Sequence, residues 1–320
     1  MDKDFDVAVV GAGYAGLACA LLLGRYRLRT AVFDGGKTRN AATRRVHGYP
    51  GFESSSPAAL LARVRQDAGQ YKSVTFLKKA VEHVAAKKGG KGFSINAGSN
   101  TNYNNNSSNS SRSYSARYVV LATGVQDIKP EIAGFDRFDG DGAWHCPHCD
   151  GPETAGKRLA LIVAGRKKLE YAREFLGWTS DITIFLHDSR IDRQELEEAE
   201  ELGIEVIDDT VTEMSGRKGR GVKRLTCASG RRHFTDLVFY RLGYVVQNRL
   251  ATEIGCRLDD DGYVRVDGEQ RTSVPGVYAA GDIDTDRHFV VLAAAAGVRA
   301  AISIYEDVVK NGGKKRRKSA

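Results

Sequence analysis

The chain has 320 residues, enough for about two domains, and its 42% hydrophobic content allows a sizeable core. Five cysteines without a framework spacing indicate a reducing, cytoplasmic compartment. The net charge of +8 comes partly from residues 314–318, where no aromatics interleave the basic residues, so we do not expect nucleic-acid binding. The polar start lacks the features of a signal peptide, and no apolar stretch reaches the roughly 20 residues of a membrane span.

A glycine-rich turn separates the first predicted strand, residues 5–10, from the first predicted helix, residues 17–23. The next strand, residues 30–33, ends in an acid. In such a unit the first glycine makes the tight turn, the second lets the backbone approach a pyrophosphate, and the third allows close packing of helix on strand. The helix N-terminus holds the phosphates and the acid takes a ribose hydroxyl. The predicted dinucleotide contacts are Gly11, Gly13, Tyr14, Ala15, Gly16 and Asp34.

The next segment is a loop in which a cofactor bound at that turn would extend, so Arg39, Asn40 and His47 are further candidate contacts. An amphipathic helix over residues 57–71 and strands over 74–77 and 91–96 follow. Residues 100–113 are nearly all Asn and Ser, which predicts a flexible hairpin loop.

A buried strand over residues 118–124 ends in Ala122, Thr123 and Gly124, whose small side chains let the backbone pass close to a nucleotide. Pro130 and a change of composition then indicate a domain boundary.

Residues 144–151 contain Cys146 and Cys149, followed at once by Asp150. A thiolate at a helix start or beside a cation is a good nucleophile, and a second thiol two residues away can resolve the mixed disulfide that the first one makes. The same spacing is typical of half a zinc site, but the other three cysteines are scattered singly. We therefore favour a redox pair and predict no metal.

Polar neighbours surround this pair. A carboxyl group such as Asp150 can be tuned by burial to deliver a proton near neutrality, although capping of the helix start is an alternative role. His145 and His148 flank the cysteines and as cations would stabilise thiolates; the alternative is that neither has a role.

The strand–helix–strand pattern then repeats. Strands over residues 158–163, 181–186 and 204–207 alternate with helices over 169–176 and 194–202, and strands over 225–228, 233–234 and 237–240 follow. A last strand, residues 274–282, ends in Gly281 and Asp282, and an Ala-rich helix spans 290–305. The acid can bind a ribityl or ribose chain, and the helix start can face a polar ring, so Gly281, Asp282, His288 and Phe289 join the candidate cofactor contacts.

These motifs, in this order over residues 5–309, resemble the low-molecular-weight thioredoxin reductase family of two-domain flavoproteins. The resemblance implies an α/β fold with two Rossmann-like domains, the second inserted in the first, and a homodimer. It implies an FAD domain over residues 1–125 and 246–310, a NAD(P)-binding-like domain over 126–245, and a basic flexible tail over 311–320.

The resemblance also implies roles for the redox motif. Cys149 would exchange electrons with the flavin of FAD, Cys146 would attack the partner disulfide, and Asp150 would supply or remove the proton. The implied partner is thioredoxin or a similar small protein.

The second nucleotide fingerprint departs from the family pattern. The three positions that should hold small residues are occupied by Val163, Gly165 and Lys168. Family members that use NADPH carry a pair of arginines for its 2′-phosphate, whereas this chain has a single Arg190 and an acid, Asp188. We therefore expect poor use of NADP(H) and another donor, such as reduced ferredoxin. The alternative is that the basic run 166–168 binds phosphate by charge.

Three functions stay open. The first is an FAD-dependent disulfide reductase. The second is a dithiol oxidase that passes electrons to oxygen, because residues 34–40, 46–48 and His145 resemble the gliotoxin- and holomycin-type oxidases. The third is a flavin-bound redox sensor. Asp150 stands where those oxidases usually carry a histidine, which favours the reductase.

Overall fold

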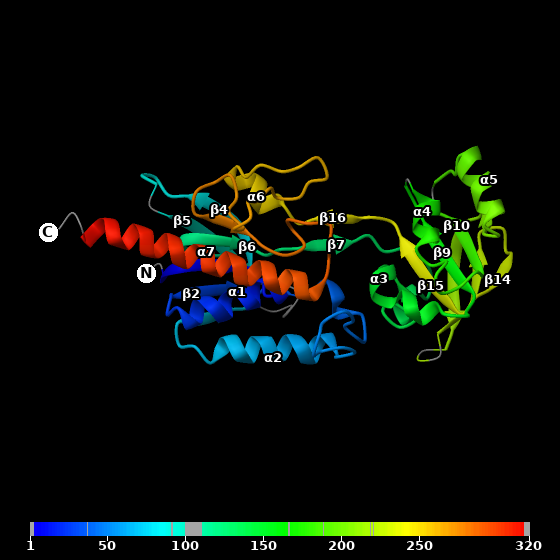
Figure 1. Ribbon diagram of the computed structural model, residues 1–320, viewed down its shortest axis with the longest axis horizontal. Coiled ribbons are helices and arrows are strands. Elements are labelled where there is room, and N and C mark those ends of the chain that lie inside the picture. The colour runs from blue at the N-terminus through cyan, green and yellow to red at the C-terminus, as the bar shows by residue number, and fades with distance from the viewer. Residues whose placement is uncertain are drawn as a thin grey trace. The chain divides into compact units, whose positions relative to one another are not determined.

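The structure, a computed structural model, describes residues 3–36, 38–90, 92–99, 111–165, 167–187, 189–217, 219 and 221–316. Its contacts divide the chain into two compact units, both visible in Figure 1. The first comprises the described parts of Met1–Arg39, Ala58–Gln126 and Val246–Ala320, and the second those of Asn40–Pro57 and Asp127–Val245. The second unit is thus inserted in the first, as predicted. The chain passes between the units after Arg39, Pro57, Gln126 and Val245, and the sequence did not indicate that Asn40–Pro57 would group with the second unit.

A seven-stranded sheet forms the centre of the first unit. Its order is β3-β2-β1-β6-β5-β4, and β17 also pairs with β6. Strands β1, β2, β3, β6 and β17 run parallel, whereas β4 and β5 are antiparallel additions. The parallel strands carry continuous apolar runs because both of their faces are covered. The bounds are β1 (Lys3–Val10), β2 (Thr30–Phe33), β3 (Val74–Leu77), β4 (Lys79–Ala86), β5 (Phe93–Ser99), β6 (Arg112–Leu121) and β17 (Val277–Ala279).

Helices α1 and α7 lie side by side along this sheet (Figure 1). Their approach is close, because a Cβ atom added at Gly297 of α7 would lie 2.0 Å from the carbonyl oxygen of Ala15 in α1. The helix predicted over 290–305 extends to Arg316, so the start of the predicted tail is helical, while residues 317–320 lie outside the described part. The bounds are α1 (Tyr14–Arg25), α2 (Pro57–Gly69), α6 (Arg249–Ile254) and α7 (Val290–Arg316).

The predicted hairpin loop over residues 100–113 falls mostly outside the described residues. The strands on either side of it, β5 and β6, are antiparallel neighbours, as a hairpin requires. Strand β4 was not predicted, since its sequence, Lys79–Ala86, mixes charged and small residues without an apolar run.

A five-stranded parallel sheet, ordered β11-β10-β9-β15-β8, forms the centre of the second unit, and a separate antiparallel sheet is ordered β12-β13-β14. The helices are α3 (Pro147–Asp150), α4 (Lys168–Arg173) and α5 (Arg193–Glu201). The strands are β8 (Ala143–Trp144), β9 (Leu159–Val163), β10 (Ile182–Leu186), β11 (Glu205–Ile207), β12 (Val211–Gly216), β13 (Val222–Cys227), β14 (Arg232–Phe234) and β15 (Leu237–Arg241).

Short elements complete the chain. Strands β7 (Val125–Asp127) and β16 (Tyr244–Val246) pair as a two-stranded sheet. Three 3-10 turns are η1 (Arg39–Ala41), η2 (Phe135–Arg137) and η3 (Gly151–Thr154). Over the described residues, no helix has both the length and the apolar character that a bilayer crossing requires.

Candidate active site

Four parallel strands of the first unit end at the same edge of its sheet. Because β1, β2, β6 and β17 run in one direction, the residues that follow them share this edge. The predicted contacts at these ends are Gly11, Asp34, Ala122, Thr123, Gly124, Gly281 and Asp282.

The three fingerprint glycines differ in what surrounds them. A Cβ atom added at Gly11 would lie 2.2 Å from the carbonyl oxygen of Ala122, and one at Gly16 would lie 1.9 Å from that of Gly11. These two glycines therefore permit backbone packing. Gly13 precedes α1 as its N-cap residue, and an added Cβ would meet only Thr38 Cγ2, at 4.0 Å. The open space at Gly13, beside the N–H groups of the first turn of α1, fits a phosphate.

Asp34 is held by groups that the sequence did not indicate. Its Oδ2 atom lies 2.6 Å from Nη1 of Arg65 on α2, and its Oδ1 atom accepts a hydrogen bond of 3.2 Å from the Gly36 N–H. The Arg65 guanidinium also stacks over the Phe76 ring at 4.5 Å. Asp34 is therefore a fixed, buried carboxylate at the end of β2.

A second arginine–carboxylate pair lies at the same edge. Nη1 of Arg39 is 3.5 Å from Oδ2 of Asp282, with both side chains largely covered. Thr123 donates a hydrogen bond of 2.7 Å to the Gln247 carbonyl, and His288 contacts the Tyr263 hydroxyl at 3.3 Å, next to Phe289. The remaining predicted first-unit contacts, Tyr14 and Ala15, lie buried in the first turn of α1.

Asn40 and His47 were predicted as cofactor contacts, but they fall in the segment that groups with the second unit. Asn40 lies in η1, and His47 lies in the loop that follows it. Their cofactor roles stay predictions.

The two motif cysteines form a disulfide at the start of α3. Cys146 is the N-cap residue, and its Sγ atom accepts a hydrogen bond of 3.2 Å from the Cys149 N–H. Pro147 occupies the first helical position, where its missing N–H costs nothing. Both sulfurs are thus engaged with each other, and the described residues contain no group of three His, Cys, Asp or Glu that could hold a metal.

Asp150 follows the disulfide directly and is partly buried. Burial and, to a lesser extent, the negative charge of Glu153 raise the pKa of its carboxyl to about 7, while His47 acts in the opposite direction. Asp150 precedes η3, but its side chain makes no capping hydrogen bond there. The capping alternative is therefore not supported, and the carboxyl can take up or release a proton near neutral pH.

The two histidines beside the cysteines have separate partners. Nε2 of His145 lies 3.5 Å from the largely buried Asp127 carboxylate, and Tyr171 donates a hydrogen bond of 3.2 Å to the His145 carbonyl. Nε2 of the exposed His148 lies 3.5 Å from Glu174. His145 is consequently the better fixed of the two.

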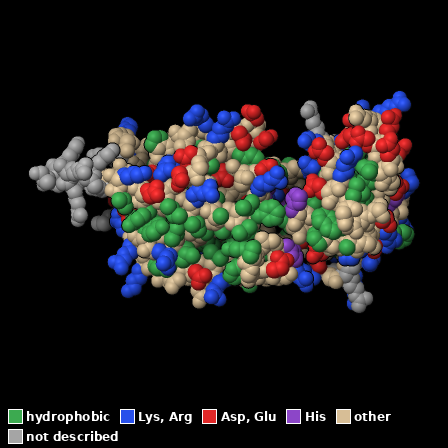
Figure 2. All heavy atoms as spheres, viewed as in Figure 1, with side chains coloured by type: hydrophobic (Ala, Val, Ile, Leu, Met, Phe, Trp, Pro, Cys, Tyr) green, Lys and Arg blue, Asp and Glu red, His purple; other side chains and the backbone are tan. Residues whose placement is uncertain are grey.

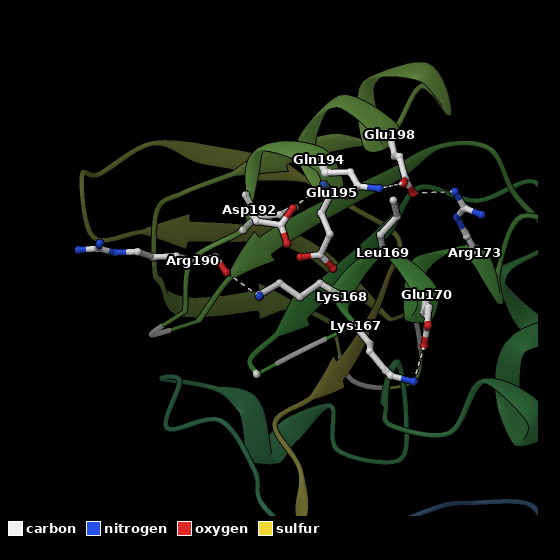
Figure 3. Close-up of a pocket in the computed structure, with 12 residues that line it drawn as sticks. Lys167, Lys168, Leu169, Glu170, Arg173, Arg190, Asp192, Gln194, Glu195 and Glu198 are labelled. Carbon is white, nitrogen blue, oxygen red and sulfur yellow. Dashed lines mark hydrogen bonds and ion pairs between the residues drawn. The ribbon is translucent and has the colours of Figure 1, made fainter.

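Charged side chains line the edge of the second sheet (Figure 3). Lys168 stands at the third fingerprint position of this unit, is buried, and donates a hydrogen bond of 2.6 Å from Nζ to the Arg190 carbonyl. Lys167, in the left-handed conformation with φ of 61°, precedes the short helix α4. The predicted phosphate-binding run begins with Arg166, which lies outside the described residues, as does Asp188.

A cavity of about 740 Å³ lies at this edge between α4 and α5. Its basic side chains are largely engaged with neighbouring carboxylates, since Lys167 pairs with Glu170 at 3.3 Å and Arg173 with Glu198 at 2.9 Å. The Arg190 side chain points away from the other lining residues (Figure 3). The lining acids are Glu170, Asp192, Glu195 and Glu198.

Comparison with known families matches residues 5–301 to the pyridine nucleotide-disulphide oxidoreductase family. The chain belongs to this family. A thioredoxin reductase of Listeria monocytogenes is 29% identical over 295 residues, which cover 88% of this chain and 86% of that protein. Among solved structures, HlmI superposes with a TM-score of 0.89 at 27% identity, covering 99% of this chain and 96% of that one. The thioredoxin reductase of T. acidophilum is 30% identical, with a TM-score of 0.58 and coverage of 96% and 100%.

These findings confirm the family and the fold class that the sequence motifs predicted. The chain is a thioredoxin reductase-like flavoprotein oxidoreductase that acts on sulfur groups, and family membership implies a bound flavin. The partner, the electron donor and the individual site residues are matters for proposal.

Proposed function

We propose that this protein is an FAD-dependent thiol–disulfide oxidoreductase that passes electrons through Cys149 and Cys146 to a disulfide of thioredoxin or a similar small protein. One observation carries the proposal. The Cys146–Cys149 disulfide is followed directly by a partly buried carboxyl group whose pKa is about 7, in a chain whose first dinucleotide fingerprint is complete.

The edge of the first sheet fits FAD. The space at Gly13 suits the pyrophosphate, Asp34 suits a ribose hydroxyl, and Asp282 suits the ribityl chain. Bound there, FAD would supply a two-electron carrier. The other residues that we propose to hold it are Gly11, Tyr14, Ala15, Gly16, Arg39, Ala122, Thr123, Gly124, Gly281, His288 and Phe289.

The dithiol form of the cysteine pair can reduce a partner by two exchanges. The Cys146 thiolate attacks the partner disulfide, forming a mixed disulfide and releasing one partner thiolate. The Cys149 thiolate then attacks the Cys146 sulfur, which re-forms the Cys146–Cys149 disulfide and releases the second partner thiolate. Two electrons and two protons pass to the partner in total. Asp150 is placed to hold a proton that the cysteine sulfurs give up or regain.

We further propose that NADPH is a poor donor for this protein. The buried Lys168 takes the place of the small residue that a dinucleotide fingerprint requires, and carboxylates line the adjoining cavity. Phosphates would meet like charge there, with two of the nearby cations already paired. Reduced ferredoxin or a dithiol would then reduce the flavin.

The buried Lys168 and the acidic lining of the adjoining cavity also favour a second candidate function, in which electrons flow in the reverse direction. A small-molecule dithiol would reduce the Cys146–Cys149 disulfide while its own two sulfurs join, and oxygen would finally take the two electrons and two protons as hydrogen peroxide. No nucleotide donor is needed in that direction. The redox-sensor hypothesis would apply if the Cys146–Cys149 pair is oxidised and reduced without catalytic turnover of a substrate.

We also propose that the protein acts as a homodimer. Figure 2 shows hydrophobic side chains gathered along the first unit, and five exposed ones lie on α7, the last four of them three or four residues apart on one face of the helix. A second copy of this chain is the partner that we expect on that face, and light scattering of the purified protein measures it. The five residues are Leu292, Val298, Ile302, Tyr305 and Val309.

An anaerobic experiment tests the main proposal. Purified holoprotein receives NADPH, NADH or dithiothreitol separately while the flavin absorbance is followed. We expect bleaching by the dithiol and slow bleaching by either nucleotide. Rapid bleaching by NADPH would contradict the proposed donor, whereas no bleaching by any dithiol would contradict the proposed function.

The direction of electron flow needs a second measurement. Holoprotein reduced with stoichiometric dithionite is mixed with oxidised thioredoxin, and new thiols on the thioredoxin are counted. Transfer supports the reductase. Absence of transfer, together with peroxide formation when air and a small dithiol are supplied, supports the oxidase.

A further inference from the structure

A loop distant in sequence packs beside the disulfide motif within the second unit. Residues 40–57 form this loop, which is closed by a bridge between Val46 and Ser55. Arg44 pairs with Asp141 at 2.5 Å, and a Cβ atom added at Gly140 would lie 2.2 Å from the Ala42 carbonyl oxygen. The loop is therefore held against the segment that leads into α3.

His47 of this loop is oriented by a carboxylate. Its Nδ1 atom lies 2.5 Å from Oε1 of Glu53, whose Oε2 atom accepts a hydrogen bond of 2.9 Å from the Gly48 N–H. These two hydrogen bonds lower the pKa of the Glu53 carboxyl, which is thus ionised and accepts the Nδ1 proton. The Nε2 atom of His47 is left to face another group.

That other group belongs to the disulfide motif. Nε2 of His47 lies 3.8 Å from Oε1 of Glu153 in η3, and the His47 side chain is only 17% exposed. His47 and Glu153 act in opposite directions on Asp150, the imidazole lowering the pKa of its carboxyl and the Glu153 charge raising it. Of the two histidines beside the cysteines, His148 lies 3.5 Å from Glu174 and His145 lies 3.5 Å from Asp127.

We propose that His47, oriented by Glu53, is a positioning residue that sets the protonation of Asp150 and so the pH range in which the Cys146–Cys149 dithiol exchanges protons. This inference rests on the proposed function. Opening the disulfide breaks the S–S bond, takes up two electrons and leaves two sulfurs that each bind a proton. With dithiothreitol as the reductant, its two thiols close to a disulfide and supply both electrons. A cationic His47 favours the carboxylate of Asp150, whereas Glu153 favours the protonated acid.

Infrared difference titration of the oxidised holoprotein tests the inference directly. The protonated-carboxyl band that disappears in Asp150→Asn reports the ionisation of Asp150 alone. We expect its midpoint near 7 in the unmodified protein. In His47→Gln the midpoint should rise by roughly half to one pH unit, and in Glu153→Gln it should fall by a similar amount, as expected for partly screened charges. Glu53→Gln should move it in the same direction as His47→Gln.

A matched control is available in the first unit. Nδ1 of His83 lies 2.9 Å from Oε1 of Glu253, so His83→Gln removes a similar pair far along the chain from the disulfide motif. We expect no movement of the midpoint in this variant. The pH profile of disulfide opening by dithiothreitol, measured by thiol trapping, should shift with the infrared midpoint in each variant.

The inference would be overturned if the infrared midpoint of Asp150 stays unchanged in His47→Gln, or if it moves to lower pH. If the flavin still bleaches with dithiol in that case, the proposed function stands. If the unmodified protein neither bleaches nor opens its disulfide, the proposed function fails instead.

Discussion

The two sheets of this protein present edges of opposite character. In the first unit, glycines leave space at the start of α1, and the carboxylates Asp34 and Asp282 are paired with arginines. In the second unit, Lys168 fills the corresponding position and acids line the cavity beside it. The second unit also carries the Cys146–Cys149 disulfide, at the start of α3 and directly after β8. The difference teaches that two units can share a parallel-sheet arrangement while the residues that follow their strands differ in size and charge.

Replacement of Cys149 tests whether the chemistry of the second unit resides on α3. Cys149→Ser should lower dithiol-driven flavin bleaching by about 10³-fold or more, because no disulfide can form. It should also abolish any thiolate-to-flavin charge-transfer band. Stopped-flow absorbance measures both. Cys227→Ser, a buried cysteine elsewhere in the same unit, serves as the control and should keep the rate. Persistence of the band would show that the two motif cysteines have been assigned the wrong way round.

The glycines of the first edge can be separated into packing and binding positions. Gly16→Ala should destabilise the protein by roughly 3 kcal/mol, because its Cβ atom would lie 1.9 Å from the Gly11 carbonyl oxygen. Gly13→Ala should keep the fold yet weaken FAD binding, since the new methyl group enters open space. Urea unfolding and flavin content measure the two effects. Equal destabilisation in both variants would refute the distinction.

Two carboxylates of the second unit, Asp150 and Asp236, should change the stability of the protein with pH in opposite directions. Asp150 has a folded-state pKa of about 7, above its unfolded value, so its ionisation destabilises the folded state as pH rises from about 4 to 7. Asp150→Asn should therefore be more stable at pH 8 by roughly 2 kcal/mol, with the difference vanishing near pH 4.

A carboxylate of the same unit provides the control for that pH effect. Arg158 lowers the pKa of Asp236 to about 2, so Asp236→Asn should lose stability at neutral pH and recover it as pH falls through that value. Urea unfolding across pH measures both variants. Parallel pH responses in the two variants would contradict the assignment.

The smallest expected effect concerns Lys168, at the edge of the sheet in the second unit. Lys168→Ala removes the buried ammonium group and its bond to the Arg190 carbonyl, and should raise the rate of NADPH-driven bleaching by no more than about tenfold. Lys167→Ala removes an exposed cation from the same loop and should leave that rate unchanged. A similar gain in both variants would point to charge rather than space as the obstacle.

Much of the fold was predictable because its signals are local. Strands over 30–33 and 74–77 appear with the predicted bounds as β2 and β3, since short β-branched and aromatic runs between polar turns have few alternatives. Strands β4 and β12 and helix α6 were missed, because their apolar residues are too few to mark a period. Helix α7 runs through Gly312 and Gly313 to Arg316, beyond the predicted end at residue 305, although paired glycines usually end a helix.

The sequence by itself determined the redox pair, the first nucleotide fingerprint and the inserted α/β arrangement, because each is encoded in residues close together along the chain. Only the tertiary structure decided which side chains surround them. Arg65 reaches Asp34 across 31 positions, and His47 lies in the same unit as Asp150 although about a hundred residues separate them. Such pairings depend on how elements pack, and no local pattern of residue types specifies them. The raised pKa of Asp150 has the same origin, since burial is a property of the folded chain.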